Sequence, residues 1–133
     1  MKYNQFNNAY NALQKLSNMN LPVRDAYNVY KLTKEIDQVY QFGVERERAL
    51  IEQYKGQPNQ DGTIRFVHGD DEESKREGVK NMIGFSKAID ELNNTEMDCE
   101  FSPITISYDS LGDQTMTAKE IMSLDGFVEL VGD

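Results

Sequence analysis

Cysteine, histidine and clustered carboxylates are the side chains of this sequence that could carry out catalysis or bind a metal. Cys99 could act as a nucleophile only with a base beside it, and the chain has one histidine, His68, to serve as that base. No third group that would orient the imidazole can be recognised. Cys99 also falls on the inward side of an alternating segment, which predicts a small buried side chain instead. One cysteine and one histidine exclude an intramolecular disulfide and a histidine-rich metal site.

Two further clusters resemble cation sites. Asp70–Glu73 offers four successive carboxylates, but neighbouring side chains on a helix diverge, so helix capping is the simpler interpretation. Asn59–Ile64 resembles the middle of an EF-hand loop, yet Gln57 and His68 stand where that loop needs acids. The sequence has no glycine-rich phosphate loop and no Gly-x-Ser-x-Gly motif. We therefore expect a turn at Asp61-Gly62, no metal, no cofactor and no enzymatic activity.

Charge is distributed unevenly along the 133 residues, which carry 14 basic and 23 acidic side chains and a net charge of −9. Residues 1–56 hold 8 basic and 6 acidic side chains, and residues 57–133 hold 6 and 17, so their net charges are +2 and −11. The acidic half would repel phosphate, which argues against nucleic acid as a direct ligand. It favours a protein partner with a basic surface, or serves solubility alone. No apolar run is long enough to cross a membrane, and the polar residues 1–20 predict no signal peptide. We expect one domain, residues 1–133.

Helical periodicity dominates the first part of the chain. Tyr3, Phe6, Tyr10, Leu13 and Leu16 share one face of a helix that should end near Ser17–Asn20. A long second helix is predicted from Pro22 to Tyr54, with an apolar seam at Val29, Leu32, Ile36, Val39, Leu50 and Tyr54. The Asp61-Gly62 turn then leads into a strand at Thr63–His68, and Asp70 is expected to cap a third helix. The predicted apolar stripe of that helix is Val79, Met82, Ile83, Ile89 and Leu92.

The C-terminal part alternates between apolar and polar residues. Glu96–Phe101 predicts a strand with Met97, Cys99 and Phe101 inside, and a second strand follows at Ile104, Ile106 and Tyr108. Leu111–Gln114 is expected to be a loop. A capping box at Thr117 and Glu120 predicts a last helix that contains Ile121, Leu124, Val128 and Val131. The result is an α+β fold: a long antiparallel helical hairpin with a small β-sheet and a short C-terminal helix.

An acidic face is the strongest candidate for partner binding. Its predicted members are the acids that end the third helix and those that point outward from the following strand: Asp90, Glu91, Glu96, Asp98 and Glu100. Alternate residues of a strand lie about 6.6 Å apart, close to the phosphate spacing of extended nucleic acid, so such a face could occupy a basic nucleic-acid groove. The same pattern is also typical of a merely solvated surface, and the sequence leaves both interpretations open.

Six of the seven tyrosines fall in the two N-terminal helices, where they could line either an interface or the rim of the core. Tyr27 and Tyr30 are the candidates for self-association, because Tyr30 lies off the apolar seam of a helix that already has surplus apolar surface. We therefore expect a homo-oligomer.

Several motifs together resemble a family of short bacteriophage proteins of unknown function. The residues that carry the resemblance are Leu13-Gln-Lys-Leu16, Leu21-Pro22-Val23, Glu45-Arg46-Glu47-Arg48, Leu50-Ile51-Glu52-Gln53-Tyr54, Asp61-Gly62-Thr63-Ile64, Leu92-Asn-Asn-Thr-Glu96, Pro103-Ile104 and Ala118-Lys119-Glu120-Ile121-Met122-Ser123-Leu124-Asp125. The sequence departs from the family pattern at Gly69–Arg76 and after Asp125. The resemblance implies a phage or prophage product located in the cytoplasm of the bacterial host.

Three functional hypotheses follow. The first is a non-enzymatic phage protein that binds and inhibits a host protein, a component of antiviral immunity, in the manner of an anti-defence or anti-CRISPR protein. The second is a phage morphogenesis or tail-assembly factor that acts as an oligomer through its long helices. The third is a small hydrolase or metal-dependent nuclease, for which the sequence offers the least support.

Overall fold

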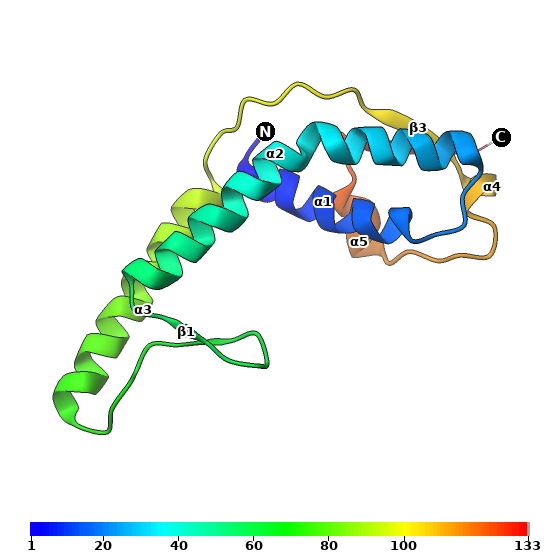
Figure 1. Cartoon of the computed structure of the whole chain (residues 1–133). Coiled ribbons are helices and arrows are strands. Elements are labelled where there is room, and N and C mark those ends of the chain that lie inside the picture. Colours follow the sequence, from blue (N-terminus) through cyan, green and yellow to red (C-terminus); the bar gives the residue numbers. More distant parts are fainter. Residues whose placement is uncertain (133) are drawn as a thin grey trace. The chain divides into compact units, whose positions relative to one another are not determined.

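The computed structural model describes residues 1–132, which form an α+β protein with long helices and two small two-stranded sheets (Figure 1). The elements in chain order are α1 (Tyr3–Ser17), α2 (Val23–Gln53), β1 (Gln57–Pro58), β2 (Ile64–Arg65), α3 (Glu72–Asn93), β3 (Ile104–Ser107), α4 (Tyr108–Leu111), α5 (Ala118–Ser123) and β4 (Val128–Val131). The bounds of α1 and α2 confirm the first two predicted helices to within a residue or two. Across the described residues, no helix is both long enough and apolar enough to cross a bilayer.

The chain divides into two compact units. The first contains residues 1–41 and the residues from Glu96 onward, and the second contains Phe42–Thr95. Helix α2 contributes its N-terminal part to the first unit and its C-terminal part to the second. The single-domain organisation stays a prediction.

The core of the first unit is built on α1. Its predicted stripe is confirmed, because Phe6, Leu13 and Leu16 are each no more than 1 % exposed. The seam of α2 covers the same core with Val29, Leu32 and Ile36. Three aromatic rings meet in this core: Phe101 stacks on Phe127 at 4.7 Å between centroids, and Phe6 meets both edge-on at 5.9 and 5.5 Å. This arrangement ties α1 to the C-terminal half of the sequence.

A parallel pair of strands, β3 and β4, completes the first unit. The register places Ile104 beside Val128 and Ile106 beside Leu130. The prediction of a helix through Val128 and Val131 was therefore wrong. Gly126 takes a φ of +84°, which ends the helical path, and Val128–Val131 beyond it forms a strand with a β-branched valine at each end.

The segment from Glu96 to Tyr108 also differs from its prediction. Within Glu96–Phe101, only an isolated bridge from Glu96 to Lys2 is strand-like. The second predicted strand is confirmed as β3, except that Tyr108 begins α4, which Ser107 caps. The predicted strand at Glu96–Phe101 was wrong because, in the part of the chain that the structure describes, no strand lies beside it to complete a ladder. The alternation is nevertheless correct, since Met97, Cys99 and Phe101 pack against the core.

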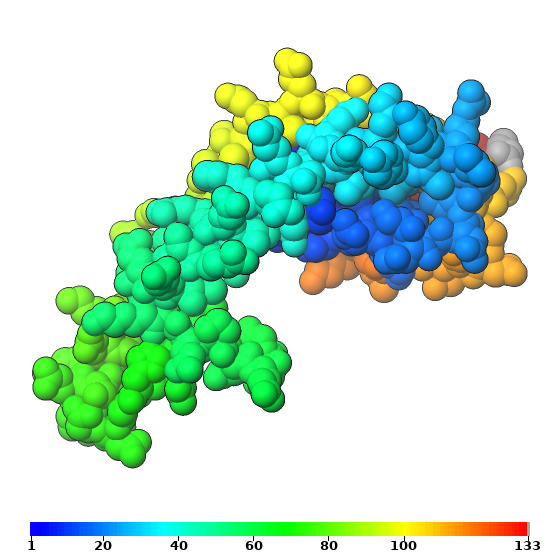
Figure 2. All heavy atoms as spheres, viewed as in Figure 1, coloured from blue at the N-terminus to red at the C-terminus, as the bar shows by residue number. Residues whose placement is uncertain are grey.

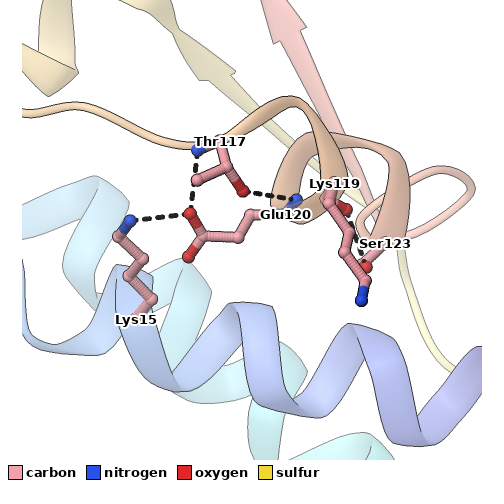
Figure 3. Close-up of polar contacts among 5 residues, drawn as sticks. All are labelled: Lys15, Thr117, Lys119, Glu120 and Ser123. Carbon is pink, nitrogen blue, oxygen red and sulfur yellow. Dashed lines mark hydrogen bonds and ion pairs between the residues drawn. The ribbon is translucent and has the colours of Figure 1, made fainter.

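The start of α5 confirms the predicted capping box. The Thr117 hydroxyl accepts from the Glu120 N–H at 3.1 Å, and the Glu120 carboxylate accepts from the Thr117 N–H at 2.8 Å (Figure 3). The same carboxylate oxygen accepts from Lys15 Nζ at 2.7 Å, which joins α5 to α1. The Lys15 ammonium, followed by the Thr117 N–H, lowers the pKa of Glu120 from 4.5 to about 2.

This depressed pKa makes the contribution of the pair depend on pH. Because the pKa is lower in the folded chain, the stabilisation is present above about pH 4.5 and is lost as the pH falls towards about 2. We expect Lys15→Met to lower the Tm at pH 7, and the Tm difference from wild type to narrow between about pH 5 and pH 3. Thermal unfolding followed by circular dichroism measures this. As a control, Lys119→Met removes a lysine of α5 that makes no such pair, so it should change Tm little at any pH. A Tm difference for Lys15→Met that does not depend on pH would contradict a stabilising role of the Lys15–Glu120 pair.

The second unit confirms the antiparallel pairing of the second and third predicted helices (Figure 1). Near the end of α2, Tyr54 meets Phe85 of α3 edge-on at 6.5 Å, and Phe66 beyond β2 lies 5.3 Å from the same ring. Between the helices, β1 and β2 form an antiparallel hairpin that pairs Pro58 with Ile64. The strand predicted at Thr63–His68 is thus present but shorter, and it lies in the connection between the helices as expected.

Two expectations for α3 were wrong. The helix is capped by Asp71, not Asp70, and the Asp71 side chain accepts from the Ser74 N–H at 3.1 Å. The predicted stripe is only partly inside: Leu92 is buried, but Val79, Met82 and Ile83 are 46, 46 and 62 % exposed. The residues that replace them on the inner side include Gly78, Gly84, Phe85 and Ala88. Small residues let the backbone approach its neighbours closely, so the larger aliphatic side chains are left outside.

Candidate protein-binding surfaces

An acidic segment, defined here as Glu96–Phe101, presents three carboxylates of the first unit to solvent. Glu96, Asp98 and Glu100 are exposed, as the sequence predicted, while the residues between them face the core. Figure 2 shows the atoms around residue 100 at the surface (yellow). Among residues 1–132, Asp98 and Glu100 are in no ion pair, whereas Glu96 Oε2 lies 3.2 Å from the N-terminal ammonium. Two of the three charges are therefore free to meet a partner.

Backbone contacts hold this segment in place although it is not part of a sheet. The Met97 N–H donates to the Met1 carbonyl at 2.9 Å, and the Ser102 N–H just beyond the segment donates to Glu35 Oε2 at 2.7 Å. Cys99 Sγ donates to the Glu35 carbonyl at 3.4 Å. Together with the inward side chains, these contacts fix the direction of the outward carboxylates before any partner binds.

The two remaining acids of the predicted face belong to α3 and therefore to the second unit. Asp90 and Glu91 are both exposed, but neighbouring helical positions point about 100° apart. Glu91 borders a cavity of about 200 Å³ with Phe42 and Arg46, whereas Asp90 does not line it. The structure thus divides the predicted face between two units, with three acids in one and two in the other.

The tyrosines divide into two groups. Tyr10 and Tyr40 stack at 3.8 Å, and the Tyr10 hydroxyl donates to Asp37 Oδ1 at 3.2 Å, so this pair lines the core. Burial, and then the hydrogen bond to Asp37, raises the pKa of Tyr10. Tyr27 and Tyr30 are instead 58 and 55 % exposed with their rings 6.4 Å apart. The core-rim interpretation is therefore confirmed for Tyr10 and Tyr40, and the interface interpretation stays a prediction for Tyr27 and Tyr30.

A groove of about 440 Å³ lies between α5 and β4 in the first unit and was not expected from the sequence. Its apolar lining includes Tyr108, Ile121, Met122 and Leu130, and Met122 is 74 % exposed. The sequence signal was the pair Ile121 and Met122 directly after the capping box, because the short helix can bury only one side. The prediction of a longer helix obscured that signal.

The groups with catalytic potential make structural contacts. Burial, and then the negative charge of Glu35, raises the pKa of Cys99, which disfavours the thiolate that a nucleophile needs. His68 Nε2 lies 2.6 Å from the Lys55 carbonyl. Cys99 and His68 belong to different units.

The two cation-like clusters also have local partners. Asp61 Oδ1 accepts from the N–H and the hydroxyl of Thr63 at 3.0 and 2.6 Å, which closes the predicted turn and lowers the pKa of Asp61. Hydrogen bonds from Ser74 lower the pKa of Asp71 in the same way. Nowhere in residues 1–132 do three or more histidine, cysteine, aspartate or glutamate side chains converge as a metal site would require.

Comparison of the chain with protein-family models, curated proteins and solved structures finds no match.

Proposed function

We propose that this chain is a non-enzymatic, phage-encoded protein that binds and inhibits a host protein, a component of bacterial antiviral immunity. The observation that carries the proposal is the set of three outward carboxylates, Glu96, Asp98 and Glu100, on a segment attached to the core. The partner has a basic surface, and inhibition follows when the acidic segment occupies that surface in place of nucleic acid. The resemblance to short phage proteins supports the origin of the chain and its place in the cytoplasm of the bacterial host.

Pre-organisation supports this mechanism. A disordered acidic tail would lose conformational freedom on binding, whereas this segment is already held by Met1, Glu35 and its own inward side chains. The three carboxylates alternate along the segment with side chains that face the core, so the charges can meet successive basic side chains of a groove that binds phosphates. Negative charge also accelerates encounter with a basic partner, most strongly at low ionic strength.

Charge reversal tests the proposal. Changing Glu96, Asp98 and Glu100 together to lysine should weaken binding of the host partner by about 10- to 100-fold at low salt, because three favourable contacts become repulsive. The fold should persist, since none of the three side chains is buried. The measurement is capture of host-lysate proteins on immobilised chain at about 50 and 500 mM salt, followed by the affinity of the recovered immunity component.

A matched control separates local contact from net charge. Reversal of Glu45, Glu47 and Glu52, which are exposed on α2 in the second unit, changes the net charge by the same amount. This variant should retain most of the affinity. Equal losses in both triple variants, or unchanged affinity of the first variant at both salt concentrations, would show that the acidic segment does not make the contact.

The second candidate function is a phage morphogenesis or tail-assembly factor that works as an oligomer. The exposed rings of Tyr27 and Tyr30 favour it, because aromatic side chains concentrate at protein interfaces. In this case Tyr27→Glu combined with Tyr30→Glu should reduce the sedimentation coefficient of the chain to that of a 15.3 kDa monomer. Lysate capture should then recover phage structural proteins, and an unchanged sedimentation coefficient would exclude a contact through these rings.

A further inference from the structure

The outer face of α3 is apolar at its centre and unpartnered. Ile83 is 62 % exposed, and Val79 and Met82 beside it are 46 % exposed. The opposite side of the same helix carries Phe85, whose ring meets those of Tyr54 and Phe66, and the buried Leu92. One helix therefore has two apolar sides, of which residues 1–132 cover only one.

Charged residues are arranged about Ile83 with opposite signs at equal distances. Arg76 lies seven residues before Ile83 and Asp90 seven residues after it. Seven residues are close to two helical turns, so both side chains project within about 20° of Ile83 and lie about 10.5 Å from it along the axis. Both are exposed, and the ion pairs of residues 1–132 include neither of them.

We propose that a second copy of this chain packs its α3 antiparallel against this face, on a twofold axis that passes near Ile83. A twofold axis places residues at equal sequence distance before and after the axis opposite each other. Arg76 of each copy then lies opposite Asp90 of the other, and the two Ile83 side chains meet at the centre. A parallel arrangement would instead oppose Arg76 to Arg76 and Asp90 to Asp90, so the charges select the antiparallel orientation.

The other side chains of the face fit this register. Val79 lies opposite Lys87 of the second copy, whose aliphatic stem can cover it while the ammonium reaches solvent. Lys80 lies opposite Ser86, a small residue that permits close approach of the two helices. No like charges are directly opposed. The apolar area is small, so the dimer should be weak and sensitive to salt.

An anionic membrane is the other surface that a helix with basic and apolar residues can bind. Arg76, Lys80 and Lys87 would suit it, but Asp90 in line with Ile83 would be repelled by acidic lipid. This contact uses Asp90 and not the carboxylates of Glu96–Phe101, so it stands independently of the proposed function.

Charge exchange between copies tests the proposal. Sedimentation velocity at about 50 mM salt should show concentration-dependent dimerisation of the wild-type chain, which Ile83→Glu abolishes. In a dimer of Arg76→Asp, two carboxylates face each other at each end of the interface, and in a dimer of Asp90→Arg two guanidinium groups do. Each single variant should therefore dimerise at least about tenfold more weakly. Mixed one to one, the two variants restore opposite charges at both ends and should form a heterodimer.

Control variants and a vesicle arm complete the test. Arg48→Asp, an exposed change on α2 in the same unit, and the Tyr27→Glu, Tyr30→Glu pair should both leave the dimer intact. Circular dichroism establishes that each variant is folded. The proposal is overturned if the wild-type chain stays monomeric, if the mixture does not associate, or if only the tyrosine pair affects association. A membrane contact would also overturn the proposal. In that case vesicles with about 30 % phosphatidylserine bind the chain, Arg76→Asp and Ile83→Glu each abolish this binding, and no dimer forms.

Discussion

Replacement of Phe127 by alanine will lower the free energy of unfolding of the first unit by about 3–5 kcal/mol. Phe127 is 1 % exposed and meets the rings of both Phe6 and Phe101. The change removes one of the three rings of this aromatic cluster, and because the surrounding structure relaxes only partly, a cavity remains in the core. Urea unfolding followed by circular dichroism measures the loss, which is large against the ~5–15 kcal/mol that holds a typical domain folded.

The same replacement should loosen the acidic segment. Phe101, the last residue of that segment, stacks on Phe127 with the ring planes 10° apart. Amide exchange should therefore accelerate at Met97 and Ile104, whose N–H groups are bonded to Met1 and to Phe127 itself. Met122→Ala, at a side chain that is 74 % exposed, serves as the control and should change stability by less than about 0.5 kcal/mol. A comparable loss of unfolding free energy in both variants would mean that Phe127 is not at the core of the first unit.

Periodicity predicted correctly where one side of an element faces a single core. The stripe of α1 and the seam of α2 follow helical spacing because each is covered on one side. The alternation of Glu96–Phe101 likewise identified which side chains face inward. It could not indicate whether a neighbouring strand completes a ladder, since hydrogen-bond partners leave no mark on the segment's own sequence. The acidic surface was therefore predictable and its backbone structure was not.

The C-terminal error has a different cause. Ile121, Leu124, Val128 and Val131 recur at intervals of three and four, which fits a helix, but Gly126 interrupts them with a positive φ. Val128–Val131 then pairs with Ile104–Ser107, a contact distant in sequence that periodicity cannot detect. The groove beside Ile121 and Met122 exists because the helix stops early, so it was missed along with the strand.

Helix α3 shows the limit of hydrophobic patterning most directly, because the side predicted to be buried is largely exposed. A pattern that counts aliphatic residues selects Val79, Met82 and Ile83 as the inner side, and it gives no weight to Gly78 and Gly84 on the other side. Close backbone approach determines which side is inside here, and glycine contributes to it by having no side chain. The surplus aliphatic side that results is the surface proposed for self-association.

Gly78→Ala should destabilise the second unit by about 1–3 kcal/mol, although alanine is the better helix former by about 1 kcal/mol. A Cβ at Gly78 would lie 2.8 Å from the Phe66 carbonyl oxygen and 2.5 Å from Val67 Cγ2. The carbonyl is backbone and cannot rotate away, so the segment after β2 must move off α3 and carry Phe66 from its place beside Phe85. Packing therefore outweighs helix propensity, and the sign of the change distinguishes the two effects in urea unfolding.

Ser86→Ala provides the matched control, because Ser86 is exposed on the same helix and the substitution again introduces alanine. There propensity acts without a packing cost, so stability should rise by a few tenths of a kcal/mol. Amide chemical shifts for Gly78→Ala should change most at Phe66 and Val67 and on the facing turn of α3. An increase in stability for both variants would mean that α3 has room for a side chain at Gly78. Close approach of the backbone would then not explain which side of α3 is exposed.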